Sequence, residues 1–167
     1  KYFPALDFAQ NGLLFLNDST LWAIADFQLW AMNIRTFKTT LLPGVEGRFL
    51  NMVQGKNKDI WLVSDNDKQQ FLWRYTEKKG FEKIRAVPHL RMDFTAVNID
   101  TAGGVWWSTI TKGLLHFSPS GVLKSEAKID SLLWHGTTMY YNDFFIDRHN
   151  RFFVYSMNKP DNQQIWR

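Results

Sequence analysis

The stretch GGVWWSTITKGLLHF, residues 103–117, holds two adjacent tryptophans, a polar run, and a glycine that begins a second apolar run. Three other segments share this pattern: TLWAIA at 20–25, DIWLVS at 59–64 and RFFVYS at 151–156. The equivalent aromatic residues of the four segments are Trp22, Trp61, Trp106 and Phe153. These positions lie 39, 45 and 47 residues apart, which is the sequence signature of an internal repeat.

Each repeat consists of short apolar segments that favour strands over helices. The segments span about 4–7 residues, are rich in Val, Ile, Phe and Trp, and are separated by Asn, Asp, Gly, Ser and Pro. One apolar segment precedes each aromatic position and another follows it, as FTAVNID at 94–100 and GLLHFSP at 113–119 do in the third repeat. A fourth segment, alternating apolar and polar residues like a half-exposed outer strand, completes the first three repeats: IRTFKTTLL at 34–42, FEKIRAV at 81–87 and VLKSEAKI at 122–129.

The sequence therefore predicts an all-β chain of about four antiparallel four-stranded repeats, the sequence form of β-propeller blades. The expected blades cover approximately 7–42, 43–88, 89–130 and 131–167. The fourth repeat holds three of the four strands, so residues 1–6 would complete it if the blades close a small ring. The alternative, which the sequence leaves open, is that the chain forms part of a larger propeller.

Composition excludes several classes of protein. Of 167 residues, 45% are hydrophobic and 22% are charged, as in an ordinary folded domain. The net charge of +4 is spread over mixed runs such as TEKKGFEKIR at 76–85, which indicates a solvated hairpin and no nucleic-acid partner. Cysteine is absent, and no apolar run is long enough to span a bilayer, so we expect no disulfide and no membrane contact by this segment. The segment KYFPALDFAQ lacks the apolar core of a signal peptide, so any export signal is expected to lie outside this sequence.

The recurring tryptophans are expected to pack between blades. Trp22, Trp61 and Trp106 recur at one point of successive repeats, which a shared structural task explains better than a ligand does. Trp107 must face the opposite side of its strand, because side chains alternate along a strand. We therefore expect both members of the tryptophan pair to lie in the core.

The third repeat resembles a known family. In NIDTAGGVWWSTITKGLLHFSPSG, residues 98–121, the positions that carry the resemblance are Asp100, Gly104, Val105, Trp106, Thr109, Gly113, Leu114, Phe117 and Gly121. These residues are similar to the two-component regulator propeller repeat. The second repeat keeps Ile60 and Trp61 of that pattern but has Phe71 and Leu72 in place of the Gly-Leu pair.

The resemblance implies a sensor. Repeats of this family build the extracytoplasmic, periplasmic sensor region of bacterial hybrid two-component receptors in the inner membrane, many of them tuned to products of polysaccharide breakdown. The chain is thus expected to bind an oligosaccharide or another small molecule, with any kinase outside it, and to need no cofactor. Other propeller blades or a second copy of the chain are further candidate partners.

Propellers usually bind ligands where outer strands connect to the next inner strands and where the two middle strands connect. The longest such connection, LLWHGTTMYYND at 132–143, holds aromatic rings with polar tips of the kind that stack on sugars: Trp134, His135, Tyr140 and Tyr141. The alternative is that these rings merely fill space beneath a long loop. Arg48, His89 and Arg91 lie in the corresponding connections of other blades and could donate hydrogen bonds to an acidic sugar.

The sequence predicts no catalytic residue and no metal ligand. No nucleophile elbow occurs, and the four histidines, among them His116 in a strand and His149 in a turn, lack metal-binding spacing. His116 is expected to face the sheet edge. Two alternatives to a sensor stay open: a protein-interaction scaffold, and a propeller enzyme of the lyase or lactonase type.

Overall fold

The computed structural model describes residues 8–42, 45–88, 95–109, 111–127, 142–157 and 163–166. These residues form β-strands, turns and connections, so the prediction of an all-β chain is confirmed. Among them there is no helix of the length and apolarity that a membrane span requires.

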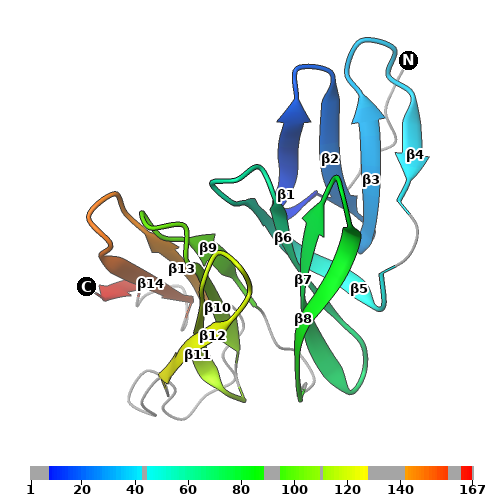
Figure 1. Cartoon of the computed structure of the whole chain (residues 1–167). Helices are drawn as coiled ribbons and strands as arrows, with labels where there is room; N and C mark the ends of the chain where they lie inside the picture. The colour runs from blue at the N-terminus through cyan, green and yellow to red at the C-terminus, as the bar shows by residue number, and fades with distance from the viewer. Residues whose placement is uncertain are drawn as a thin grey trace.

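The strands form four antiparallel sheets in chain order, which we call blades 1 to 4 (Figure 1). Blade 1 comprises β1 (Phe8–Asn17), β2 (Thr20–Ala25), β3 (Gln28–Asn33) and β4 (Thr39–Leu41). Blade 2 comprises β5 (Arg48–Gln54), β6 (Ile60–Asp65), β7 (Gln69–Thr76) and β8 (Gly80–Pro88). Blade 3 comprises β9 (Val97–Ile99), β10 (Val105–Thr109), β11 (Gly113–Phe117) and β12 (Leu123–Ala127). The described part of blade 4 comprises β13 (Asn142–Ile146), β14 (Phe152–Met157) and β15 (Gln163–Trp166).

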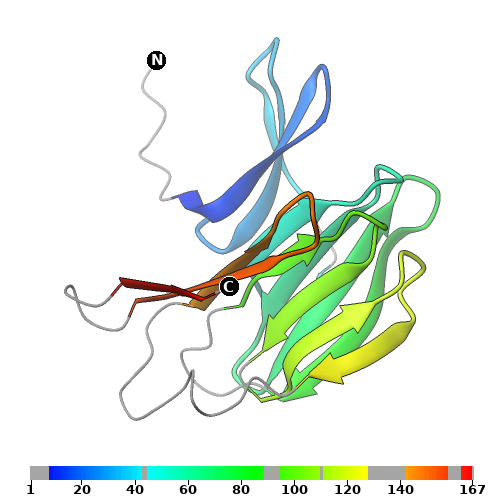
Figure 2. The ribbon, with the colours of Figure 1, turned by 90° about the vertical axis from the view of Figure 1, so that its left-hand side faces the viewer.

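The blades follow one another along an arc. Their first strands are neighbours in the order β1, β5, β9, β13. In Figure 1, β1 and β13 lie well apart, with blades 2 and 3 between them. Figure 2 shows the same arc from the side, with the sheets of blades 2 and 3 packed face to face.

Each blade has a forward face, which meets the next blade, and a rear face, which meets the preceding one. Two apolar clusters fill the spaces between blades 1 and 2 and between blades 2 and 3. The first joins Trp22, Ile24 and Leu29 of blade 1 to Phe49, Leu62, Phe71 and Trp73 of blade 2. The second joins Trp61, Val63 and Leu72 of blade 2 to Val97, Trp107, Leu115 and Phe117 of blade 3. Alternation along each strand thus gives the middle strands of blade 2 two buried faces, because blade 2 has a blade packed on either side.

The repeated tryptophans Trp22 and Trp61 are buried between blades, as the sequence predicts, and both point forward. Trp22 and Trp61 are 3% and 1% exposed, and the Trp22 ring centroid lies 4.8 Å from that of Tyr75 in the next blade. Trp107 points to the rear and is fully buried. Trp106 departs from the expectation because it is only half-buried, although its ring meets Phe152 of blade 4 edge-on at 4.6 Å.

Candidate functional site

The ends of the blades differ in their connections. One end, the loop face, carries the connections between the two middle strands and those from each outer strand to the next inner strand. The other end, the turn face, carries the short turns between first and second strands and between third and fourth strands. The ligand site expected from the sequence belongs to the loop face.

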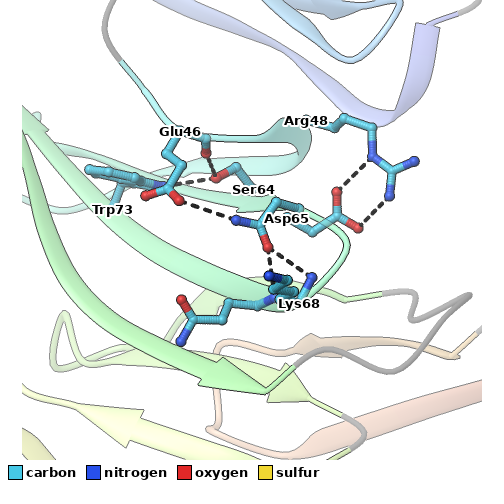
Figure 3. Close-up of polar contacts among 8 residues, drawn as sticks. Glu46, Arg48, Ser64, Asp65, Lys68 and Trp73 are labelled. Atoms are coloured by element: carbon cyan, nitrogen blue, oxygen red, sulfur yellow. Dashed lines mark hydrogen bonds and ion pairs between the residues drawn. The ribbon is translucent and has the colours of Figure 1, made fainter.

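On the loop face, Arg48 is held by a buried carboxylate. Arg48 begins β5 and lies opposite Asp65, which ends β6. The Nε and Nη2 atoms of Arg48 donate to Oδ1 and Oδ2 of Asp65 at 3.0 and 3.1 Å (Figure 3). The Asp65 side chain is only 4% exposed, whereas that of Arg48 is 52% exposed. One edge of the guanidinium is therefore fixed, and the hydrogen bonds to Asp65 raise the pKa of Arg48 above its usual value.

An exposed aromatic ring lies beside this guanidinium. Phe27 is 54% exposed, and Cζ of Arg48 lies 5.7 Å from its ring centroid. Asp26 and Phe27 form the β2–β3 turn with φ of 51° and 59°, a left-handed conformation that is uncommon for a bulky side chain. The carbonyl of Phe27 accepts a hydrogen bond from the Phe49 amide at 2.8 Å, which ties this turn to blade 2. Phe27, Arg48 and Asp65 thus form a small cluster built from two blades.

A second polar network supports this cluster from within blade 2. Oε2 of Glu46 pairs with Nζ of Lys83 at 2.7 Å, and Oε1 accepts from Nδ2 of Asn66 at 3.1 Å. The carbonyl of Glu46 accepts a hydrogen bond from Oγ of Ser64 at 2.6 Å. Oγ of Ser64 in turn accepts a hydrogen bond from Nε1 of Trp73 at 2.9 Å (Figure 3). These bonds restrain the segment that precedes Arg48, so the connection from which the guanidinium projects is held in place.

The turn face carries a different type of cluster. In blade 3, Oδ2 of Asp100 accepts from Nε1 of Trp106 at 3.0 Å and lies 3.2 Å from Nε2 of His116. Its Oδ1 accepts from the amides of Ala102 and Gly104 at 2.9 and 2.7 Å. Burial alone would raise the pKa of Asp100, but the hydrogen bonds from Trp106 and these amides, with His116 nearby, lower it below its usual value.

His116 does not face the sheet edge, which corrects the expectation from the sequence. Its ring stacks on Trp106 with centroids 4.0 Å apart and an interplanar angle of 6°. The physical reason is register: His116 lies directly opposite Trp106 across β10 and β11, so both side chains emerge on the forward face.

Blade 2 holds an equivalent cluster. Oδ2 of Asp59 accepts from Nε1 of Trp61 at 3.1 Å and from Nε of Arg74 at 2.8 Å. Cζ of Arg74 lies 5.5 Å from the Trp61 ring centroid, and the two residues are cross-strand partners. The Asp59 and Arg74 side chains are 5% and 20% exposed. Because each cluster braces an indole inside the blade, we assign these carboxylates a structural role.

A shallow hollow also opens on the turn face. It has a volume of about 420 Å³ and is lined by Leu16, Asn17, Asp18, Ser19, Arg35 and Lys58. It lies away from the Phe27, Arg48 and Asp65 cluster, at the opposite end of blades 1 and 2. Within the described part of the chain, no group of three or more His, Asp or Glu side chains could hold a metal ion.

Of the predicted ligand-binding residues, the structure describes only Arg48, and it adds two neighbours that the sequence analysis missed. His89, Arg91, Trp134, His135, Tyr140 and Tyr141 lie outside the described residues. Phe27 could have been suspected as a bulky residue in a two-residue hairpin turn. Asp65 could have been found only from the register that places it opposite Arg48.

Comparisons with known proteins establish the fold. No family model and no curated protein matches the sequence. Among solved structures, the chain is similar to a calcium-binding protein, regucalcin, from Agrobacterium tumefaciens, with a TM-score of 0.68 and 14% identity over 92% of this chain and 55% of that one. It is similar to virginiamycin B lyase from Staphylococcus aureus, with a TM-score of 0.63 and 11% identity over 97% of this chain and 56% of that one.

A third similar structure is the extracellular domain of a protein assigned as a hybrid two component system from B. thetaiotaomicron. Here the TM-score is 0.62 and the identity 21%, over 98% of this chain and 23% of that one. The β-propeller fold expected from the sequence is therefore confirmed, and the resemblance to the sensor repeat agrees with this structure. The chain spans about half the length of the regucalcin and the lyase, and sensors and enzymes share its fold.

Proposed function

We propose that this chain is part of the ligand-binding propeller of an extracytoplasmic, periplasmic sensor in a two-component receptor. We further propose that its loop face binds an acidic, polysaccharide-derived ligand. The likeness to the extracellular domain from B. thetaiotaomicron and the repeat pattern at 98–121 support the sensor role. In this role the chain binds and does not catalyse.

The arrangement of Phe27, Arg48 and Asp65 carries the ligand chemistry. An exposed aromatic ring offers a surface for the apolar face of a sugar ring. The half-exposed guanidinium offers N–H donors to a carboxylate, and Asp65 already fixes its orientation, so little side-chain entropy is lost when a ligand binds. A sugar that carries a carboxylate satisfies both groups at once.

The remaining loop-face residues would extend this site. Trp134, His135, Tyr140 and Tyr141 would add stacking surfaces and hydrogen-bond partners, while His89 and Arg91 would add donors for a second acidic group. These six assignments rest on their places in the connections between strands.

Isothermal titration calorimetry of this chain against paired neutral and uronate-containing oligosaccharides tests the proposal. We expect binding of the acidic members. Arg48→Lys keeps a cation beside Asp65 but loses the planar fork, so affinity for acidic members should fall by about 1 kcal/mol or more, roughly tenfold. Phe27→Ala and Tyr141→Ala should each weaken acidic and neutral members alike by about 1 kcal/mol.

Arg35→Lys on the turn face makes the same exchange of a guanidinium for an ammonium away from the site, so it is the matched control and should leave affinity unchanged. Thermal melts of every variant exclude unfolding as the cause of lost binding. Equal binding by Arg48→Lys and the native chain would place the site elsewhere. Turnover of any oligosaccharide would favour an enzyme of the lyase or lactonase type, and capture of a protein alone would favour an interaction scaffold.

A further inference from the structure

The turn face of blades 1 and 2 carries an excess of positive charge. It is formed by the β1–β2, β3–β4, β5–β6 and β7–β8 turns. In the described part of the chain, the exposed charged side chains of these turns that make no ion pair are six cations and two carboxylates: Arg35, Lys38, Lys56, Lys58, Lys78 and Lys79, with Asp18 and Glu77. On the loop face of the same two blades, the corresponding described side chains are Asp26, Asp67 and Lys68. The positive charge therefore gathers at one end of these blades.

The hollow on the turn face brings cations from both blades together. Arg35 of the β3–β4 turn and Lys58 of the β5–β6 turn both line it, and Asp18 is the one carboxylate among its lining residues. Lys58 has a φ of 62°, which is uncommon for a long side chain, and its amide donates to the carbonyl of Gly55 at 3.1 Å. A guanidinium and an ammonium that line one hollow without a carboxylate partner suit an oxyanion such as a phosphate.

An exposed phenylalanine lies among these cations. Phe37 is 62% exposed, has a φ of 55°, and lies between Arg35 and Lys38 in the β3–β4 turn. Oδ1 of Asn33 accepts from the amides of Arg35 and Thr36 at 3.0 Å each, and the carbonyl of Asn33 accepts from the Phe37 amide at 2.8 Å. The turn therefore holds the ring out toward solvent. An apolar group combined with a basic surface supplies the two attractions that keep a protein at an anionic membrane.

We propose that the turn face of blades 1 and 2 docks on an anionic lipid bilayer, with its cations at the headgroup phosphates and the Phe37 ring at the acyl boundary. Figure 1 shows the β1–β2 and β3–β4 turns at the upper end of blade 1, and the β7–β8 turn at the upper end of blade 2. The loop face is the opposite end of each blade, so a docked chain keeps the Arg48 site open to its ligand. Docking at the surface needs no spanning segment. It therefore revises the expectation of no membrane contact, which rested on the lack of a long apolar run.

The composition of this surface favours a bilayer over an acidic protein as the partner. Five of the six unpaired cations are lysines, a residue type that is depleted in protein interfaces. Phe37 is the one large hydrophobic residue that is highly exposed in the described turns of these two blades, so the surface lacks the apolar core of a protein interface. Lysines spread over several turns instead match a surface of many mobile phosphates.

Co-sedimentation of the native chain with lipid vesicles tests this docking. The chain should bind vesicles of phosphatidylcholine with about 30% phosphatidylglycerol, should not bind vesicles of phosphatidylcholine alone, and should be released as salt rises. Lys58→Asn removes one cation and keeps a residue that tolerates a left-handed turn, and it should weaken binding about fivefold. Lys68→Asn is the matched control: it lowers the net charge equally but lies on the loop face, and it should bind like the native chain.

A second matched pair tests the aromatic ring. Phe37→Asn should weaken binding to the anionic vesicles about tenfold, because the ring no longer enters the bilayer. Phe27→Asn removes an equally exposed ring from a left-handed turn on the loop face and should leave vesicle binding unchanged. Circular dichroism melts confirm that each variant is folded, and Lys38→Asn replaces Lys58→Asn if that variant is not.

Three results would overturn the proposal. The first is a native chain that does not bind the anionic vesicles even at low salt. The second is an equal loss of binding by Lys58→Asn and Lys68→Asn, which would show an effect of net charge alone. The third is native-like vesicle binding by Phe37→Asn together with equally tight binding of soluble polyglutamate by the native chain, which would assign the surface to an acidic protein.

Discussion

Blades 2 and 3 place a carboxylate beside the forward-pointing tryptophan from opposite ends of the same turn. In both turns the amide of the first residue donates to the carbonyl of the fifth, Gly55 to Asp59 at 2.8 Å and Asp100 to Gly104 at 2.9 Å. Blade 2 has glycine first and aspartate last, whereas blade 3 has aspartate first and glycine last. The repeat therefore preserves the position of a negative charge in space and not its position in sequence.

The two carboxylates also differ in their second partner. Asp59 pairs with the guanidinium of Arg74, and Trp61 beside it is 1% exposed. Asp100 lies beside the imidazole of His116, and Trp106 is half-buried. Blade 2 thus holds a charged pair in a closed interface, while blade 3 holds its counterpart in a more open one. Substitutions should be more costly in blade 2.

The largest difference is expected for the two indole rings. Trp61→Ala should reduce the free energy of unfolding by about 4 kcal/mol, because it removes a fully buried aromatic ring. Trp106→Ala should cost about 2 kcal/mol, because part of that ring already contacts solvent. Urea denaturation followed by circular dichroism measures both values. Equal costs would show that exposure does not distinguish the two blades.

Removal of the carboxylate should likewise cost more stability in blade 2 than in blade 3. Asp59→Ala leaves the guanidinium of Arg74 and the indole N–H of Trp61 without their acceptor in a buried site, at a cost of about 3 kcal/mol. Asp100→Ala should cost about 2 kcal/mol, since its site is more accessible to water. The same urea titrations apply, with Asp67→Ala as an exposed control near zero. A larger cost in blade 3 would reverse the comparison.

Exchanging Gly55 and Asp59 in the turn of blade 2 tests whether stability depends on a carboxylate beside Trp61, whichever of the two positions supplies it. Asp59→Gly alone should cost about 3 kcal/mol, and adding Gly55→Asp, which gives blade 2 the order of blade 3, should restore about 2 kcal/mol. The coupling comes from a double-mutant cycle with Gly55→Asp alone as the fourth corner. A double variant no more stable than Asp59→Gly alone would mean that the first turn position cannot deliver a carboxylate to Trp61.

The smallest expected effect is the loss of the stability contributed by Asp100 at low pH. Because the pKa of Asp100 is lowered in the folded chain, its contribution to stability is complete above its ordinary pKa of about 3.9 and is lost as pH falls through the lowered value. The stability difference between the native chain and Asp100→Asn, about 1 kcal/mol at pH 5, should therefore shrink toward pH 2. Urea titrations at each pH measure it. A difference that grows on acidification would contradict this sign.

Asp147 of blade 4 gives an internal reference for that titration. Slight desolvation would raise its pKa, but Arg151 and the amides of His149 and Arg151 donate hydrogen bonds that lower the pKa to about 2. Carboxyl carbon chemical shifts should show Asp147 titrating near pH 2. A midpoint near 4 would show that its pairing with Arg151 does not persist in solution.

The spacing of the aromatic residues was enough to predict the blades. Trp22, Trp61 and Trp107 are buried as expected, because a two-residue period along a strand fixes which face each side chain takes. Pattern alone could not predict the half-burial of Trp106, which depends on what blade 4 places over it. The outer strands were also predictable from their alternating residues, but only β8 has the half-buried face that alternation implies, whereas β4 and β12 are exposed at every residue.

The clusters were less predictable because they depend on pairing across strands. Arg74 and His116 meet their tryptophans through register, and a sequence does not show register directly. Asp59 was overlooked because it precedes its tryptophan by two positions, whereas Asp100 precedes its own by six. Arg48 was recognised as a donor from its place in a connection, but the orientation imposed by Asp65 was not.

The exchanged turn residues also bear on how the repeats diverged. A Cβ atom on Gly55 would overlap the carboxylate of Asp59, and one on Gly104 would overlap both Asp100 and His116. A turn with aspartate at both places is thus crowded, and a turn with glycine at both leaves the indole without an acceptor. If the blades arose by duplication of one ancestral unit, the first and fifth turn residues had to change together. A single substitution at either position would now give a turn with two aspartates or with none. Such paired changes reduce the sequence similarity between the repeats while their fold stays the same.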